Sequence, residues 1–179
     1  PSVLRVYVSR IRTRMHDPGI ILLLESGDYQ VAPYLQVDLD DIEEMLRTAG
    51  RQHAVTEEIR ERLSRYVRTY AYEVPASMIS WEWFAPFSGR ALELSRRAAL
   101  LLAGDAIERG APAEARAYGD RLTALDPFDE AAWEATIRAS LASGDVASAR
   151  RSYRKFSELL AKELGSGPSA KLRELVTLL

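Results

Sequence analysis

Apolar side chains recur at helical spacing through most of the chain. From residue 38 onward they stand three and four positions apart in successive segments, as in helices that bury one face. Asp38, Asp40 and Asp41 precede the first of these segments, and carboxylates at a helix start satisfy its free N–H groups. The pattern predicts helices over residues 37–50 and 56–72 and a further helical region at 98–164.

A β-hairpin is predicted near the N-terminus, where the helical spacing is lost. Proline and glycine within residues 16–19 form a helix stop, and an apolar run follows at 20–25. A Ser-Gly-Asp turn signal at 26–28 then separates this run from a second short one at 29–31. A strand, a glycine-containing turn and another strand in this order are typical of a hairpin.

The first fifteen residues predict a short basic helix. Leu4, Val8, Ile11 and Met15 form one stripe of a 3.6-residue period, and the segment has no acidic residue. A helix that is apolar on one side and cationic on the other is typical of nucleic-acid recognition helices, and also of an ordinary solvated arginine face. The residues alone leave both interpretations open. The candidate nucleic-acid contacts are Arg5, Ser9, Arg10, Arg12 and Arg14.

Residues 98–164 contain an internal repeat. Gly110 and Gly144 are 34 positions apart, and the alanines and the arginine that follow each glycine recur with the same offset. Each copy contains a helix, a short break and a second helix. A helix–turn–helix period of 34 residues is that of the tetratricopeptide repeat (TPR).

The finer spacing within this repeat also matches the TPR pattern. Trp133, Ala149 and Tyr153 follow one another at intervals of sixteen and four, as the aromatic, alanine and aromatic positions of that pattern do. Gly119 departs from it, because a large apolar residue is usual at its position. The segment therefore predicts an array of paired helices with one unexplained glycine.

The C-terminal residues predict a short terminal helix with an apolar face. Glycines and a proline within 165–168 break the preceding helix. Such a face normally covers the open end of a helical array, and it can equally dock onto a second subunit. The residues of this face are Leu172, Leu175, Val176 and Leu179.

An aromatic cluster lies between the first predicted helices and the repeat. One interpretation is packing between these two helical regions. The other is a pocket for a ligand or a partner, because indole and phenol rings offer large rigid contacts with polar tips. The candidate pocket residues are Tyr70, Trp81, Trp83 and Phe84, with Tyr72 and Phe87 nearby.

Composition narrows the classes of function. The chain has 179 residues and a formal net charge of −2. It has no cysteine, and this excludes disulfides and thiolate chemistry and favours a cytoplasmic protein. Its longest apolar run, residues 20–24, is too short to span a membrane. His16 and His53 lie in separate segments without zinc-site spacing, and no catalytic constellation is found. We therefore expect no enzyme activity, no metal, no cofactor and no membrane partner.

Two stretches of the chain resemble parts of one protein family. Residues 4–15 and 20–31, with a Gly-x-Tyr element at 27–29, look like the recognition helix and wing of a response-regulator-type winged helix. A Val-Asp-Leu sequence at 37–39, the TPR-like body and the tail from Tyr153 onward resemble the bacterial transcriptional activator domain of SARP-type regulators, named for antibiotic regulatory proteins. Together the two resemblances cover nearly the whole chain.

The resemblance implies a domain organisation. Residues 1–33 would be the C-terminal part of a winged-helix DNA-binding domain, and residues 37–179 a TPR-like, right-handed helical array. Family members carry a small sheet and two helices ahead of the recognition helix. Since the chain begins with Pro1 rather than methionine, we expect it to be a fragment of a longer DNA-binding protein.

The resemblance also implies a role in transcription. Arg5, Ser9 and Arg12 would face the major groove, and Arg10 and Arg14 would lie nearer the phosphates. The helical body would mediate dimerisation or contact RNA polymerase. The alternative is a TPR-like module for protein interaction or ligand sensing that does not bind DNA.

Overall fold

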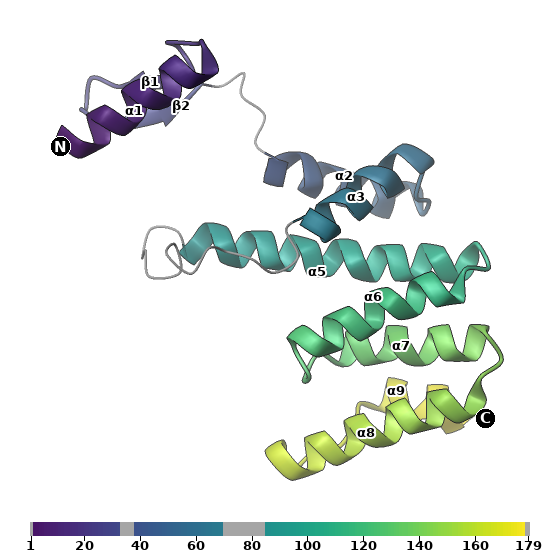
Figure 1. The fold of residues 1–179 in the computed structure, drawn as a ribbon. Helices are drawn as coiled ribbons and strands as arrows, with labels where there is room; N and C mark the ends of the chain where they lie inside the picture. The colour runs from purple at the N-terminus through teal and green to yellow at the C-terminus, as the bar shows by residue number, and fades with distance from the viewer. Residues whose placement is uncertain (1, 33–37, 70–84, 178–179) are drawn as a thin grey trace. The chain divides into compact units, whose positions relative to one another are not determined.

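The computed structural model describes residues 2–32, 38–69 and 85–177, which belong to two compact units, Pro1–Asp41 and Ile42–Leu179 (Figure 1). The N-terminal unit contains helix α1 (Ser2–Met15), strands β1 (Ile21–Leu23) and β2 (Tyr29–Val31), and the start of α2 (Asp38–Gln52). The second unit, which we term the helical body, contains the rest of α2 and α3 (Glu57–Thr69), α5 (Ala85–Glu108), α6 (Pro112–Leu125), α7 (Glu130–Ala142), α8 (Val146–Leu164) and α9 (Ala170–Thr177). The prediction of an all-α, TPR-like fold with one small hairpin is confirmed.

The 34-residue repeat has its structural basis in the turns between helices. Gly110 and Gly144 both adopt a left-handed backbone, with φ angles of 75° and 77°. After the first of them the N–H of Ala111 donates to the carbonyl oxygen of Ala106 at 2.8 Å, and the equivalent bond after Gly144 measures 2.9 Å. This is the Schellman motif, which satisfies the last carbonyl groups of a helix within a sharp reversal. The same turn therefore joins α5 to α6 and α7 to α8.

An aromatic and aliphatic core holds α7, α8 and α9 together. The rings of Trp133 and Phe156 stack with their centroids 5.5 Å apart, and the Phe156 side chain is fully buried. Leu172 of α9 is only 1% exposed and packs in the same cluster as Ile137. Of the two roles predicted for the terminal apolar face, covering the end of the array is the one that the structure contains. Leu179 lies outside the described residues.

Gly119 allows α6 to approach α7 closely. A Cβ atom at this position would lie 2.9 Å from the backbone nitrogen of Thr136 and 3.1 Å from its Cα, distances that real Cβ atoms avoid. In the first repeat the backbone of α6 therefore lies directly against the backbone of α7. The equivalent position of the second repeat carries the ring of Tyr153. This contact explains the glycine that departs from the TPR pattern.

A buried carboxylate joins α3 to α5. Asp105 is 9% exposed and accepts hydrogen bonds from Arg60 of α3 and from Arg109, which directly follows α5, both at 2.8 Å. The hydrogen bond from Arg60 lowers the pKa of Asp105 below its ordinary value, burial opposes this effect, and Arg109 reinforces it. The carboxylate is therefore held ionised between two guanidinium groups.

A second buried carboxylate joins α5 to α7. Asp129 forms the N-cap of α7, where it accepts from the N–H of Ala131 at 3.0 Å, and it also accepts from Arg96 of α5 at 3.0 Å. Burial by itself would raise the pKa of Asp129, but the hydrogen bond and charge of Arg96 and the cap N–H groups outweigh it and leave the pKa lowered. One side chain thus begins a helix and fixes it to its neighbour.

Both histidines of the protein end helices. His16 and His53 follow α1 and α2 with φ angles of 53° and 50°. The prediction that the first body helix ends at Gly50 is wrong, because α2 continues to Gln52 and the left-handed His53 stops it. Histidine is one of the few residues other than glycine that occupies this region with some frequency.

Candidate nucleic-acid interface

Helix α1 lies along the hairpin and shares a small core with it (Figure 1). Val8, Ile20 and Ala32 are the buried hydrophobic residues of this part of the chain, at 5%, 5% and 2% exposure. The strands pair antiparallel with Ile21 opposite Val31, and the N–H of Ala32 donates to the carbonyl of Ile20 at 2.9 Å. The hairpin is therefore a short, regular element that covers about one turn of the helix.

Arg12 joins α1 to strand β1. Its Nε donates to the carbonyl oxygen of Ile21 at 3.0 Å, and its Nη2 donates to the same oxygen. Residue 12 is four positions beyond Val8, so both side chains lie on the hairpin side of the helix. The family resemblance implies a major-groove contact for Arg12 and does not indicate this bond to the strand, which the spacing from Val8 signals.

The remaining predicted residues of α1 divide into two sets. Arg5, Ser9, Arg10 and Arg14 are all exposed. At 100° per residue, Arg10 and Arg14 lie on the side of the helix away from the hairpin, whereas Arg5 and Ser9 lie beside the hairpin-facing side. The structure thus keeps these polar side chains accessible, but it does not gather all of them on one face.

The tip of the hairpin is acidic. The N–H of Leu24 donates to the carbonyl of Asp28 at 2.8 Å, and Gly27 closes the turn with a φ angle of 88°. Ser26 Oγ donates to the Asp28 carboxylate at 2.8 Å, and Glu25 stands exposed beside it. Two carboxylates at this tip oppose close approach to phosphate groups.

The apolar stripe predicted for α1 is only partly buried. Val8 is buried as expected, but Leu4, Ile11 and Met15 are 54%, 44% and 56% exposed in the described structure. The physical reason is the size of the hairpin, whose two strands have three residues each and reach only the side of the helix near Val8 and Arg12. Within the described structure the hairpin thus covers Val8 and leaves these three side chains of the stripe exposed.

The candidate pocket residues Tyr70, Trp81, Trp83 and Phe84 lie outside the described residues, and Phe87 is 54% exposed at the start of α5. Within the described ranges, no group of three or more His, Cys, Asp or Glu could hold a metal ion. No helix in those ranges is long and apolar enough to cross a membrane.

Comparisons with known proteins identify relatives of the chain. The family model described as "Bacterial transcriptional activator domain" matches residues 37–178. The structure is similar to that of Mycobacterium tuberculosis EmbR in complex with a low affinity phosphopeptide, with a TM-score of 0.76 and 22% sequence identity. This similarity covers 98% of the chain but 48% of EmbR, so the chain spans about half the length of that protein. No curated protein matches the chain.

Proposed function

Because the chain belongs to the bacterial transcriptional activator domain family, we propose that it acts in a DNA-binding regulator of transcription, of the SARP type. In this proposal α1 is the recognition helix of a winged-helix domain and the β1–β2 hairpin is its wing. The helical body mediates dimerisation or contact with RNA polymerase.

The observation that carries the proposal is the exposed cationic surface of α1. The helix has no acidic residue, and Arg10 and Arg14 project from the side opposite the hairpin. Guanidinium groups bond phosphate oxygens or guanine edges through two N–H groups at once. The same side exposes Val3, Val6 and Tyr7, so the surface offered to a groove combines guanidinium groups with apolar side chains.

The contacts of α1 support a division of labour among its polar residues. Arg12 acts as a positioning residue, because its bonds to the Ile21 carbonyl set the angle between helix and hairpin. Arg10 and Arg14 contact DNA, and Arg5 and Ser9 reach it from the flank nearer the hairpin. The acidic hairpin tip contributes little attraction, so the helix supplies most of the binding energy.

The test is DNA binding measured as a function of salt concentration. The chain selects duplexes from a random pool, and affinity for the enriched duplex is then measured by fluorescence anisotropy. The double variant Arg10→Ala/Arg14→Ala should weaken binding and reduce the slope of log K against log salt by about 2, one for each lost phosphate contact. Arg173→Ala, an exposed arginine of α9, is the matched control and should leave both quantities unchanged.

The alternative function, a TPR-like interaction or ligand-sensing module, predicts a different outcome. The pool would then yield no enriched duplex, and the double variant would bind DNA no more weakly than Arg173→Ala. Either result overturns DNA recognition by α1. Arg12→Ala distinguishes a positioning role from a direct DNA contact. If Arg12 only positions the helix, the variant should bind DNA more weakly with an unchanged salt slope. If Arg12 contacts a phosphate, the slope of log K against log salt should also fall by about 1.

A further inference from the structure

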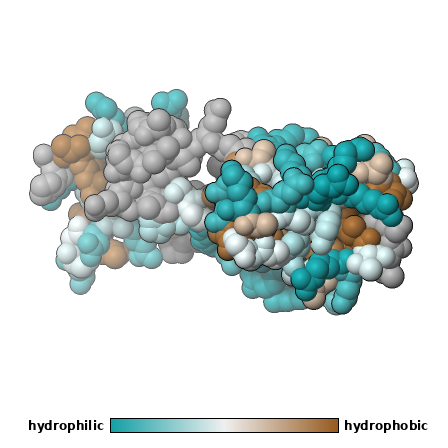
Figure 2. Space-filling view, turned by 90° about the horizontal axis from the view of Figure 1, so that it is seen from below, coloured by the Kyte–Doolittle hydropathy of each residue, from teal (hydrophilic) through white to brown (hydrophobic). Residues whose placement is uncertain are grey.

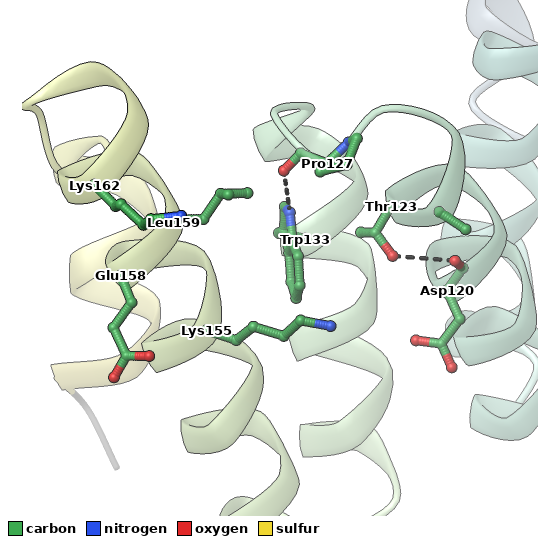
Figure 3. Close-up of a pocket in the computed structure, with 9 residues that line it drawn as sticks. Asp120, Thr123, Pro127, Trp133, Lys155, Glu158, Leu159 and Lys162 are labelled. Carbon is green, nitrogen blue, oxygen red and sulfur yellow. Dashed lines mark hydrogen bonds between the residues drawn. The ribbon is translucent and has the colours of Figure 1, made fainter.

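A trough runs along α7 between α6 and α8. Its wider end has a volume of about 590 Å³ and is bordered by Thr123 of α6, Trp133 of α7, and Lys155 and Lys162 of α8 (Figure 3). A narrower hollow of about 190 Å³ shares three of these residues and continues the trough toward Arg151. Thr136, Ser148 and Ser152 are buried beneath the narrower part, at 2%, 8% and 8% exposure. The two hollows together offer an elongated surface rather than a closed cavity.

Trp133 is fixed rigidly at the wider end. Its indole N–H donates to the carbonyl oxygen of Pro127 at 2.8 Å, and Phe156 stacks against the ring. The ammonium group of Lys155 lies 5.5 Å from the centroid of the indole ring. Figure 3 shows Lys155 extending toward Trp133. A cation is thus held over an aromatic face at the edge of an open trough.

Three cations of α8 lack the acidic partners that arginines have elsewhere in the body. Among the described residues, Arg151, Arg154 and Lys155 form no ion pair, whereas many arginines of α2 to α7 pair with carboxylates. The body surface seen from below in Figure 2, the side on which α8 lies in Figure 1, is mostly hydrophilic. The positive charge on α8 is therefore available to an external anion.

Two carboxylates line the trough, and neither neutralises these cations. Asp120 accepts hydrogen bonds from Arg116 at 3.1 and 3.2 Å, and is thereby occupied. Glu158 extends away from Trp133 in Figure 3. Lys162 pairs with Glu163 at 2.9 Å, so the charge left for binding is that of Arg151 and Lys155.

We propose that this trough binds an acidic peptide segment of a partner protein. Carboxylates of the segment pair with Arg151 and Lys155, and one apolar side chain packs at the wider end, against Ala124, Pro127 and Leu159. Charge complementarity and the elongated shape favour an acidic peptide. The surface lies on the helical body and does not depend on DNA binding by α1.

The experiment is a selection from a displayed library of random 12-residue peptides. The whole chain is the bait, and peptides that also bind the Lys155→Glu variant are removed. The enriched peptides should be rich in Asp and Glu around an apolar residue. The best of them is then measured by anisotropy, together with a counterpart in which every Glu and Asp is replaced by Gln and Asn.

Arg151→Glu and Lys155→Glu should each weaken peptide binding by about tenfold or more, because each places like charges together. Arg68→Glu, an exposed position of α3, is the control with the same change in charge. Ala124→Trp fills the wider end without changing charge and should abolish binding. Thermal unfolding of each variant verifies that the body is intact.

Three results would overturn the proposal. Selection could enrich no acidic peptides, or the neutral counterpart could bind as tightly as the acidic peptide. A DNA duplex could also displace the peptide and lose affinity in the same α8 variants, which would make the trough a nucleic-acid surface. The α1 variants do not alter the trough. The salt experiment therefore tests DNA binding by α1, and the peptide selection tests the trough independently.

Discussion

The N-terminal unit and the helical body use similar local patterns but bury very different fractions of their apolar side chains. In the N-terminal unit Val8 is the buried apolar residue of α1, while Leu4, Ile11 and Met15 of its stripe stay exposed. In the body α3 and α5 to α8 each contribute residues with no exposed surface, among them Phe156. The difference shows that an amphipathic stripe predicts a helix reliably, whereas its burial depends on what packs against it.

The largest expected effect comes from removing the centre of the body core. Phe156→Ala should lower the free energy of unfolding by about 3–5 kcal/mol, because it leaves a cavity beneath Trp133. Val8→Ala, the corresponding change in the N-terminal unit, should leave the unfolding of the body unchanged. Urea titration followed by far-ultraviolet circular dichroism measures both. Equal losses would mean that the two units unfold as one.

Gly119→Ala tests the close contact within the body. The added methyl group should push α6 away from Thr136 and lower the free energy of unfolding by about 1–3 kcal/mol, even though alanine favours a helix more than glycine does. Gly104→Ala is the matched control, because a Cβ at that position of α5 has no atom within 4 Å. The control should gain up to about 1 kcal/mol. A gain in both variants would contradict the backbone contact.

Acid should weaken the body through Asp105 and Asp129. Folding lowers the pKa of both carboxyl groups. Their contribution to the stability of the fold is therefore fully present above the pKa of the unfolded chain, about 3.9, and is lost as the pH falls through the lower pKa of the folded state. Urea unfolding between pH 7 and pH 2.5 should therefore show stability falling below about pH 4. Asp105→Asn should make this fall shallower, while Glu61→Gln, in an exposed pair on α3, should not. An unchanged profile in Asp105→Asn would contradict the assignment.

The smallest expected effect concerns the two left-handed histidines. His53→Gly should raise the stability of the body by about 1 kcal/mol or less, because glycine adopts a positive φ without strain. His16→Gly relieves the same strain at the end of α1 and should not change the melting temperature of the body. Differential scanning calorimetry compares the two. A body transition that moves equally in both would contradict the division into two units.

The sequence predicted the elements with regular spacing well, because their patterns are local. The glycines at positions 110 and 144 indicated the repeat, and both prove to form the same hydrogen-bonded turn. The hairpin at 21–31 was also predicted, since its Ser-Gly-Asp turn needs no long-range information. The family resemblance drawn from residues 37–179 is confirmed by the family match.

Features that depend on tertiary contacts were not predictable. The glycine at position 119 is explained by its closeness to Thr136, which the sequence does not reveal. Gly50 has the character of a helix end, but the structure ends the helix at the left-handed His53. In the candidate site, the exposure of Arg10 and Arg14 followed from helical spacing. The engagement of Arg12 with a strand carbonyl requires knowing where the hairpin lies.

The turns at Gly110 and Gly144 also bear on how the protein is made. Each joins helices that pack against their sequence neighbours. Most contacts of the body therefore connect residues that are near one another in the sequence, and such contacts form quickly during folding. A chain leaving the ribosome can therefore add one helix at a time to those already docked. The hydrophobic end of this growing stack stays open until Leu172 emerges, which makes the synthesis of α9 the step that seals it.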